Sequence, residues 1–126
     1  MSDEVDAELA RAARLFDAAQ YHEAHELLDA LWDAASQRDS DFFKGLIQAC
    51  IALHHFALGN TAGARKLYAG HRQYLGAYLP AHRGLDVAAF LRSMQSCFAA
   101  LLRARDGAEP QLDPALRPRM EFLDSA

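Results

Sequence analysis

The stretch "DFFKGLIQACIALHHFALGN" (residues 41–60) decides the fold. Its apolar side chains cover more than half of a helix circumference, which is typical of a helix buried on most sides. We therefore predict a central helix over residues 41–58. Gly59 supplies a left-handed stop, and Asn60 caps a fourth helix over residues 61–79. Two helices joined this tightly must be antiparallel neighbours.

Apolar residues at steps of three and four predict further helices on both sides of this pair. The first covers residues 4–19, and a second follows it at once. Asp39 or Ser40 is placed to cap the central helix by accepting hydrogen bonds from its free amides. Asp86 is placed to cap a fifth helix that ends near Arg105.

Residues 106–126 contain one glycine and three prolines, which predict an extended tail. Apolar side chains in this segment indicate that the tail packs on the bundle. They are Leu112, Leu116, Met120, Phe122 and Leu123. We therefore predict a single helical domain over residues 1–105 and a packed tail over residues 106–126.

An internal repeat supports a pair of helical hairpins. "FDAAQYHEAHELL" from Phe16 aligns with "FALGNTAGARKLY" from Phe56, and small residues fall where two backbones approach. This arrangement is typical of tetratricopeptide-like hairpins, although only two units are present. The predicted fold class is all-α: a compact bundle of two antiparallel, tetratricopeptide-like helical hairpins, with a fifth helix and an extended C-terminal tail.

The composition is that of one soluble globular domain, with 126 residues, 52% apolar and 24% charged. A formal net charge of −4 gives no reason to expect nucleic acid as a partner. The amino terminus lacks the order of a signal peptide, and the longest apolar run, residues 46–58, is short and interrupted. We therefore expect a cytoplasmic protein without a membrane span.

The candidate site begins in "YHEAHELLDALW" (residues 21–32). On a helical wheel His25 and Asp29 lie on one border of the apolar stripe, one turn apart, with Trp32 next along the same edge. "HELLD" differs by one residue from the zinc-protease pattern His-Glu-x-x-His. Aspartate also binds divalent metals, so a metal stays possible but the signal loses its specificity.

The central helix offers partners for this edge. Lys44, Gln48, Ile51 and His55 recur on its less apolar side. If that side faces residues 21–32, Gln48 and His55 join the cluster inside a helical bundle, where such folds build metal and cofactor sites. Two imidazoles and one or two carboxylates suit zinc, iron or manganese.

Residues 16–67 resemble a bacterial and archaeal family, domain of unknown function 309. The matching elements follow one another in the family's order. They are Glu23-Ala24-His25-Glu26, Trp32, Gly45-Leu46-Ile47-Gln48, His55, Gly59-Asn60 and Gly63-Ala64. Asp29 stands where the family usually has Glu, and Gln20 where it often has Gly. The resemblance implies a small all-α fold and a cytoplasmic location, but no activity. It also implies one common site that contains His25, Glu26, Asp29, Trp32, Gln48 and His55.

Two hypotheses for function follow. In the first, His25, Asp29 and His55 hold a divalent metal, Glu26 handles protons on a bound water, and Trp32 and Gln48 contact a cofactor or small ligand. The domain would then be a metal-binding or hydrolase-like protein, and whether it is an enzyme stays open.

In the second hypothesis the domain is a noncatalytic scaffold that binds a partner chain or itself, for example as a homodimer. The His and carboxylate cluster is then a structural hydrogen-bond network. Among the other histidines, we expect His54 in the core, and His22, His71 and His82 exposed.

Overall fold

The computed structural model describes residues 2–105 and 107–123, which form five helices and one very short hairpin. The helices are α1 (Ser2–Asp17), α2 (Tyr21–Asp33), α3 (Gln37–Ala57), α4 (Thr61–Leu75) and α5 (Val87–Arg103). Short 3-10 turns lie at Gly76–Tyr78 and Pro114–Leu116, and strands β1 (Ala81–His82) and β2 (Leu85–Asp86) pair antiparallel. The predicted all-α bundle is confirmed.

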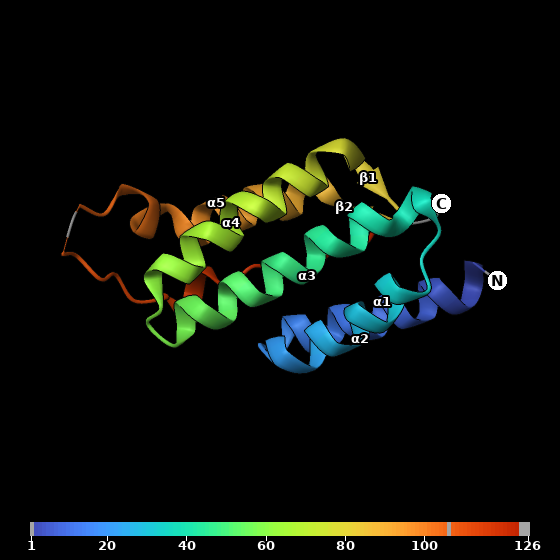
Figure 1. Cartoon of the computed structure of the whole chain (residues 1–126), viewed down its shortest axis with the longest axis horizontal. Coiled ribbons are helices and arrows are strands. Elements are labelled where there is room, and N and C mark those ends of the chain that lie inside the picture. Colours follow the sequence, from blue (N-terminus) through green and yellow to red (C-terminus); the bar gives the residue numbers. More distant parts are fainter. Residues whose placement is uncertain (1, 106, 124–126) are drawn as a thin grey trace.

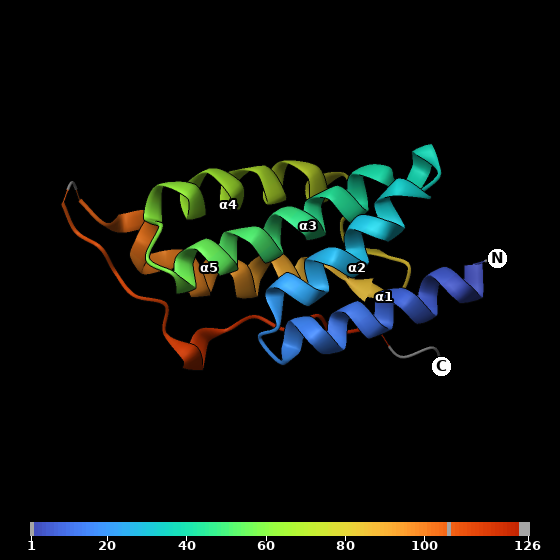
Figure 2. The same ribbon diagram turned by 60° about the horizontal axis from the view of Figure 1, so that its bottom comes forward.

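Helix α3 lies between α2 and α4, with which it makes the two most extensive helix contacts (Figure 1). Helix α1 packs along α2, and α5 lies behind α4 (Figures 1 and 2). More than half of the 21 residues of α3 are buried, so the prediction of a central helix is confirmed. The helix pairs α1–α2 and α3–α4 are the two predicted hairpins.

The start of α3 differs from the prediction. The helix begins at Gln37, after Ser36, and Asp39 therefore lies within its first turn rather than before it. Asp39 is only 6% exposed as a residue, and its carboxylate pairs with His82 and Arg83 instead of capping the helix. A tertiary ion pair has replaced the local capping bond that the sequence suggested.

The tight turns agree with the sequence. Gly59 has φ +83°, and the Asn60 side chain accepts a hydrogen bond from the Gly63 amide at 3.1 Å. The Asp86 carboxylate likewise caps α5 by accepting from the Ala89 amide at 2.9 Å. Both caps are local interactions that a short sequence motif specifies.

The core joins the two hairpins to α5 through aromatic rings. Phe16 lies 5.5 Å from Phe90, and Phe56 lies 5.0 Å from Phe98, measured between ring centroids. The two phenylalanines that align in the internal repeat therefore meet α5 at positions two helical turns apart. Because Phe16 and Phe56 are buried against Phe90 and Phe98, α5 packs on both hairpins.

The tail crosses the bundle and ends beside the hairpin (Figure 2). Met120 is 3% exposed, and its amide donates to the Asp17 carboxylate at 2.8 Å. The Leu123 amide donates to the Gly84 carbonyl at 2.7 Å, which adds a bridge beside β2. Within the described residues, no helix is long and apolar enough to cross a membrane.

Candidate functional site

Helices α2, α3 and α4 each carry one stripe of half-buried side chains, and contacts between the stripes place them on one common face. Residues three or four positions apart share a helix side, which gives each stripe its spacing. We name this surface the α2–α3–α4 face. It consists of His25, Asp29 and Trp32 from α2, Lys44, Gln48, Ile51 and His55 from α3, and Gly63, Leu67, Gly70 and Tyr74 from α4.

The Lys44 ammonium joins the three helices at one end of this face. Its nitrogen lies 5.7 Å from the centre of the Trp32 ring and 5.0 Å from the centre of the Tyr74 ring. Trp32 also donates its indole N–H to the Ser40 hydroxyl at 3.1 Å. Cation–π contacts of this kind contribute about 0.5–1 kcal/mol each at exposed sites. Trp32 therefore uses its polar atom and its ring to pack helices.

Gln48 extends from α3 over the backbone of α4. A Cβ atom at Gly70 would lie only 1.8 Å from the Gln48 amide oxygen, so the glycine makes room for this side chain. No hydrogen bond was found from the Gln48 amide to another residue in the described part of the chain. An amide carries both donors and acceptors, so Gln48 can offer either to a ligand.

His55 points toward α4 rather than toward α2. Its Nδ1 lies 3.1 Å from the Asn60 amide nitrogen, which donates to it because the Asn60 oxygen already accepts from Gly63. A Cβ atom at Gly63 would come within 3.1 Å of the His55 ring, so the ring is seated against the start of α4. His55, which the sequence offered as a partner to His25, is thus held at the α4 edge of this face.

His54, not His55, faces the α2 side. The rings of His22 and His54 have centroids 6.5 Å apart, and those of His22 and His25 are 6.2 Å apart. The prediction that His54 lies in the core is wrong, because this histidine is exposed. Helix α3 extends beyond the start of α2 (Figure 1), and the neighbouring His22 is itself exposed.

Glu26, the predicted proton carrier, lies on the outer side of α2. Its carboxylate pairs with His22 Nε2 at 3.1 Å, and both side chains are about two-thirds exposed. Across residues 2–105 and 107–123, no group of three or more His, Cys, Asp or Glu side chains is arranged to hold a metal ion. The ligand set His25, Asp29 and His55 stays a prediction.

A comparison with known protein families matches a segment that contains most residues of the α2–α3–α4 face. Residues 9–67 match the family model described as "Domain of unknown function (DUF309)". Over this segment the chain resembles that family. The chain is also similar to "Uncharacterized protein YpuF" of Bacillus subtilis (strain 168), with 36% identity over 84 residues. These residues are 62% of this chain and 47% of that relative, so the chain spans about half the length of the relative.

The resemblance drawn from the motif residues is thereby confirmed. The DUF309 match contains α2 and α3 but ends within α4, at Leu67. Gly70 and Tyr74, which complete the α2–α3–α4 face, lie beyond it.

His71 lies outside the DUF309 match and was predicted to be exposed, which is wrong. Its side chain is 0% exposed beside Tyr68 and Phe90. Nδ1 bonds the Tyr68 carbonyl, and Nε2 has no hydrogen-bond partner among the described residues. Burial lowers the pKa of His71 to about 4, so its imidazole is neutral at pH 7. The signal was present, because His71 continues the buried stripe of Ala64, Tyr68 and Leu75.

A second feature that sequence reasoning missed is an ion network at the hairpin. Asp39 accepts from His82 Nε2 at 2.8 Å, and Arg83 donates Nε and Nη2 to Asp39 at 3.1 and 2.8 Å. Arg83 Nη1 reaches Asp6 of α1 at 2.8 Å. The Arg83 guanidinium holds the pKa of Asp39 below its usual value. His82, predicted to be exposed, is half-buried here, and the network fastens the hairpin to α1 and α3.

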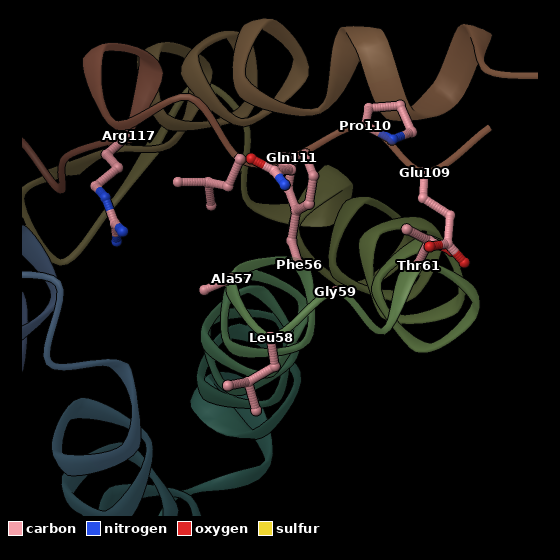
Figure 3. Close-up of a pocket in the computed structure, with 10 residues that line it drawn as sticks. Phe56, Ala57, Leu58, Gly59, Thr61, Glu109, Pro110, Gln111 and Arg117 are labelled. Carbon is pink, nitrogen blue, oxygen red and sulfur yellow. The ribbon is translucent and has the colours of Figure 1, made fainter.

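The tail and the α3–α4 turn line two sides of an open hollow of about 420 Å³ (Figure 3). Glu109, Pro110 and Gln111 border it on the tail side, and Phe56 and Thr61 on the bundle side. Arg117 extends from the tail and donates to the Tyr21 hydroxyl at 3.0 Å. The predicted site residues do not line this hollow.

Proposed function

We propose that this domain of unknown function is a noncatalytic binding module that holds a helix of a partner protein on the α2–α3–α4 face. One observation carries the proposal: the predicted site residues other than Glu26 are half-buried along a three-helix surface, and the hollow described above lies elsewhere. A surface of this kind suits a macromolecule better than a small substrate, because small-molecule sites are concave and enclose their ligand.

The chemistry of the face supports a helix as the occupant. Ile51 and Leu67 offer apolar area, Gln48 offers an amide that is free to bond, and Asp29 offers a carboxylate to a basic side chain. The stripe on α3 has the spacing of one helix side, so a partner helix lying along it meets it with its own residues at steps of three and four. Aromatic anchors such as Tyr74 are common at the centre of such interfaces.

The position of Glu26 also favours a noncatalytic role. A general base must lie within hydrogen-bond reach of the proton that it takes. Glu26 instead pairs with His22 on the solvent side of α2, away from Asp29 and His55 on the α2–α3–α4 face. The second hypothesis from the sequence, an interaction scaffold, therefore has the better support.

The experiment compares two variants that introduce the same charge. Ile51→Arg places a cation in the middle of the face, and Gln95→Arg places one on the exposed side of α5. Proteins that copurify from cells with the wild-type domain are identified first. They are then ranked by how strongly Ile51→Arg reduces the recovered amount while Gln95→Arg leaves it unchanged. The leading protein is then purified and titrated against each variant by calorimetry.

A 1:1 complex that Ile51→Arg weakens by a hundredfold, and that Gln95→Arg leaves unchanged, would support the proposal. Equal affinity of all three domains would contradict it. A wild-type dimer that Ile51→Arg dissociates, seen by sedimentation equilibrium, would also contradict it, because the occupant would then be a second copy of the chain. Circular dichroism establishes beforehand that both variants are folded.

A further inference from the structure

Four of the six histidines gather where α2 begins and α3 ends. The antiparallel packing of these helices brings His22 beside His54, with ring centroids 6.5 Å apart. His25 lies one turn along α2 from His22, with centroids 6.2 Å apart, and His55 follows His54 at 6.5 Å. This arrangement differs from the His25, Asp29 and His55 set, because the histidine that faces α2 is His54.

We propose that His22, His25 and His54 bind a divalent transition-metal ion, with zinc as the ion best suited. Neutral imidazole is a good ligand for zinc, nickel and copper, at metal–nitrogen distances of about 2.0–2.1 Å. His22 is the centre of the group, because it neighbours both of the others. His25 also belongs to the α2–α3–α4 face, but His22 and His54 lie outside it, so the metal site does not require a partner on that face.

The rings do not converge on one point in the structure, so binding requires them to turn. The His22 side chain is 64% exposed and His54 is exposed as well, so these two rings have room to turn toward the half-buried His25. Rotation about two side-chain bonds moves each ring nitrogen by several ångströms without moving the helices. A metal held in this way bridges α2 and α3 at an end where their contact is otherwise solvent-exposed.

Glu26 has a defined part in this site. Its carboxylate lies 3.1 Å from His22 Nε2, in position to orient that ring while Nδ1 binds the metal. Carboxylates that hold metal-binding histidines typically strengthen metal affinity by about 10–100-fold. Glu26 is therefore a positioning residue for His22.

His55 provides a matched control on the same helix. Its Nδ1 bonds the Asn60 amide and its ring rests against α4, so it faces away from His22. The competing ligand set of His25, Asp29 and His55 requires His55, whereas the proposed set requires His54. Single substitutions at these neighbouring positions therefore distinguish the two sets.

The test titrates ZnCl2, NiCl2 and MgCl2 into protein purified without a histidine tag, at pH 7.5, by calorimetry. We expect saturable 1:1 binding of zinc and nickel, but not magnesium, to the wild type and to His55→Ala. Glu26→Gln should weaken zinc binding roughly tenfold, and His22→Ala and His54→Ala, which each remove a ligand, should weaken it further.

Absence of saturable zinc binding to the folded wild type would overturn the proposal. Equal binding by all variants would overturn it too, as would loss in His55→Ala and Asp29→Ala with retention in His54→Ala. Circular dichroism before each titration separates loss of a ligand from loss of the fold.

Discussion

The buried histidine of α4 makes the stability of this domain depend on pH. His71 is fully buried, and burial lowers its pKa from the ordinary 6.5 to about 4, with the Arg72 charge adding to the shift and the bond to the Tyr68 carbonyl opposing it. The unfolded chain binds this proton near pH 6.5, whereas the folded chain binds it only near pH 4. The free energy of unfolding is therefore highest above pH 6.5 and falls as the pH decreases from 6.5 to 4.

The magnitude follows from these two pKa values. For a single group with pKa 6.5 unfolded and about 4 folded, the free energy of unfolding falls by about 2–3 kcal/mol between pH 7.5 and pH 4.5. Since domains of this size are stable by only about 5–15 kcal/mol, this loss is a large part of the total. Carboxylates such as Asp39 add their own acid dependence, so the contribution of His71 must be taken as a difference.

The assay is urea denaturation followed by circular dichroism at pH 7.5 and pH 4.5, for the wild type and His71→Leu. Leucine fills a similar volume without a titrating group, and the Nε2 atom that lacks a partner among the described residues is removed. We expect the variant to lose about 2–3 kcal/mol less than the wild type between the two pH values. His54→Leu, at an exposed histidine, should behave as the wild type. Equal losses in His71→Leu and the wild type would refute the reasoning.

Three further substitutions test the packing of the bundle by thermal and urea denaturation. Gly45→Ala should destabilise by about 1 kcal/mol despite its better helix propensity, because the new Cβ would lie 2.7 Å from the buried Leu75 side chain, whereas Gly76→Ala, where a Cβ meets nothing, should not destabilise. Asp39→Asn should cost about 2 kcal/mol, because its arginine and histidine partners lose their counter-charge; no change would mean that the network is only a surface feature. Met120→Ala should cost about 2 kcal/mol if the tail is part of the folded unit, and an unchanged midpoint would show that it is not.

The sequence predicted those features that depend on neighbouring residues. The turn at Gly59 and Asn60 and the cap at Asp86 involve bonds over three residues, so a short motif contains the whole interaction. The central position of α3 followed from its apolar circumference, because a helix with that pattern has to be covered on most sides. Trp32 and Gln48 lie on the sides of α2 and α3 that the spacing indicated, since helical spacing alone sets the side of a helix; their contact with a cofactor or ligand stays a prediction.

The errors concern residues whose surroundings are set by distant segments. His54 and His71 were assigned opposite to what the structure has, because their exposure depends on where α2 begins and on where α5 packs. The Asp39 network joins residues 43 or 44 positions apart, and no local pattern announces such a pair. The buried stripe of α4 did contain a signal for His71, but a histidine on that stripe was given the exposure usual for its residue type.

Some of the family motif residues fix the helices, and others have polar groups that can bind a partner protein. Trp32 donates its indole N–H to Ser40 and contacts Lys44 with its ring, and His55 bonds Asn60. These residues therefore hold α2, α3 and α4 together. Gln48 is different, because its amide reaches the surface through the space that Gly70 leaves. A motif that combines helix-fixing residues with a polar group free to bond is what a rigid interaction surface requires, since fixed helices reduce the ordering cost of binding. The strongest effect on partner affinity is therefore expected at the centre of the α3 stripe, and substitutions at Trp32 should act on affinity mainly through the arrangement of the helices.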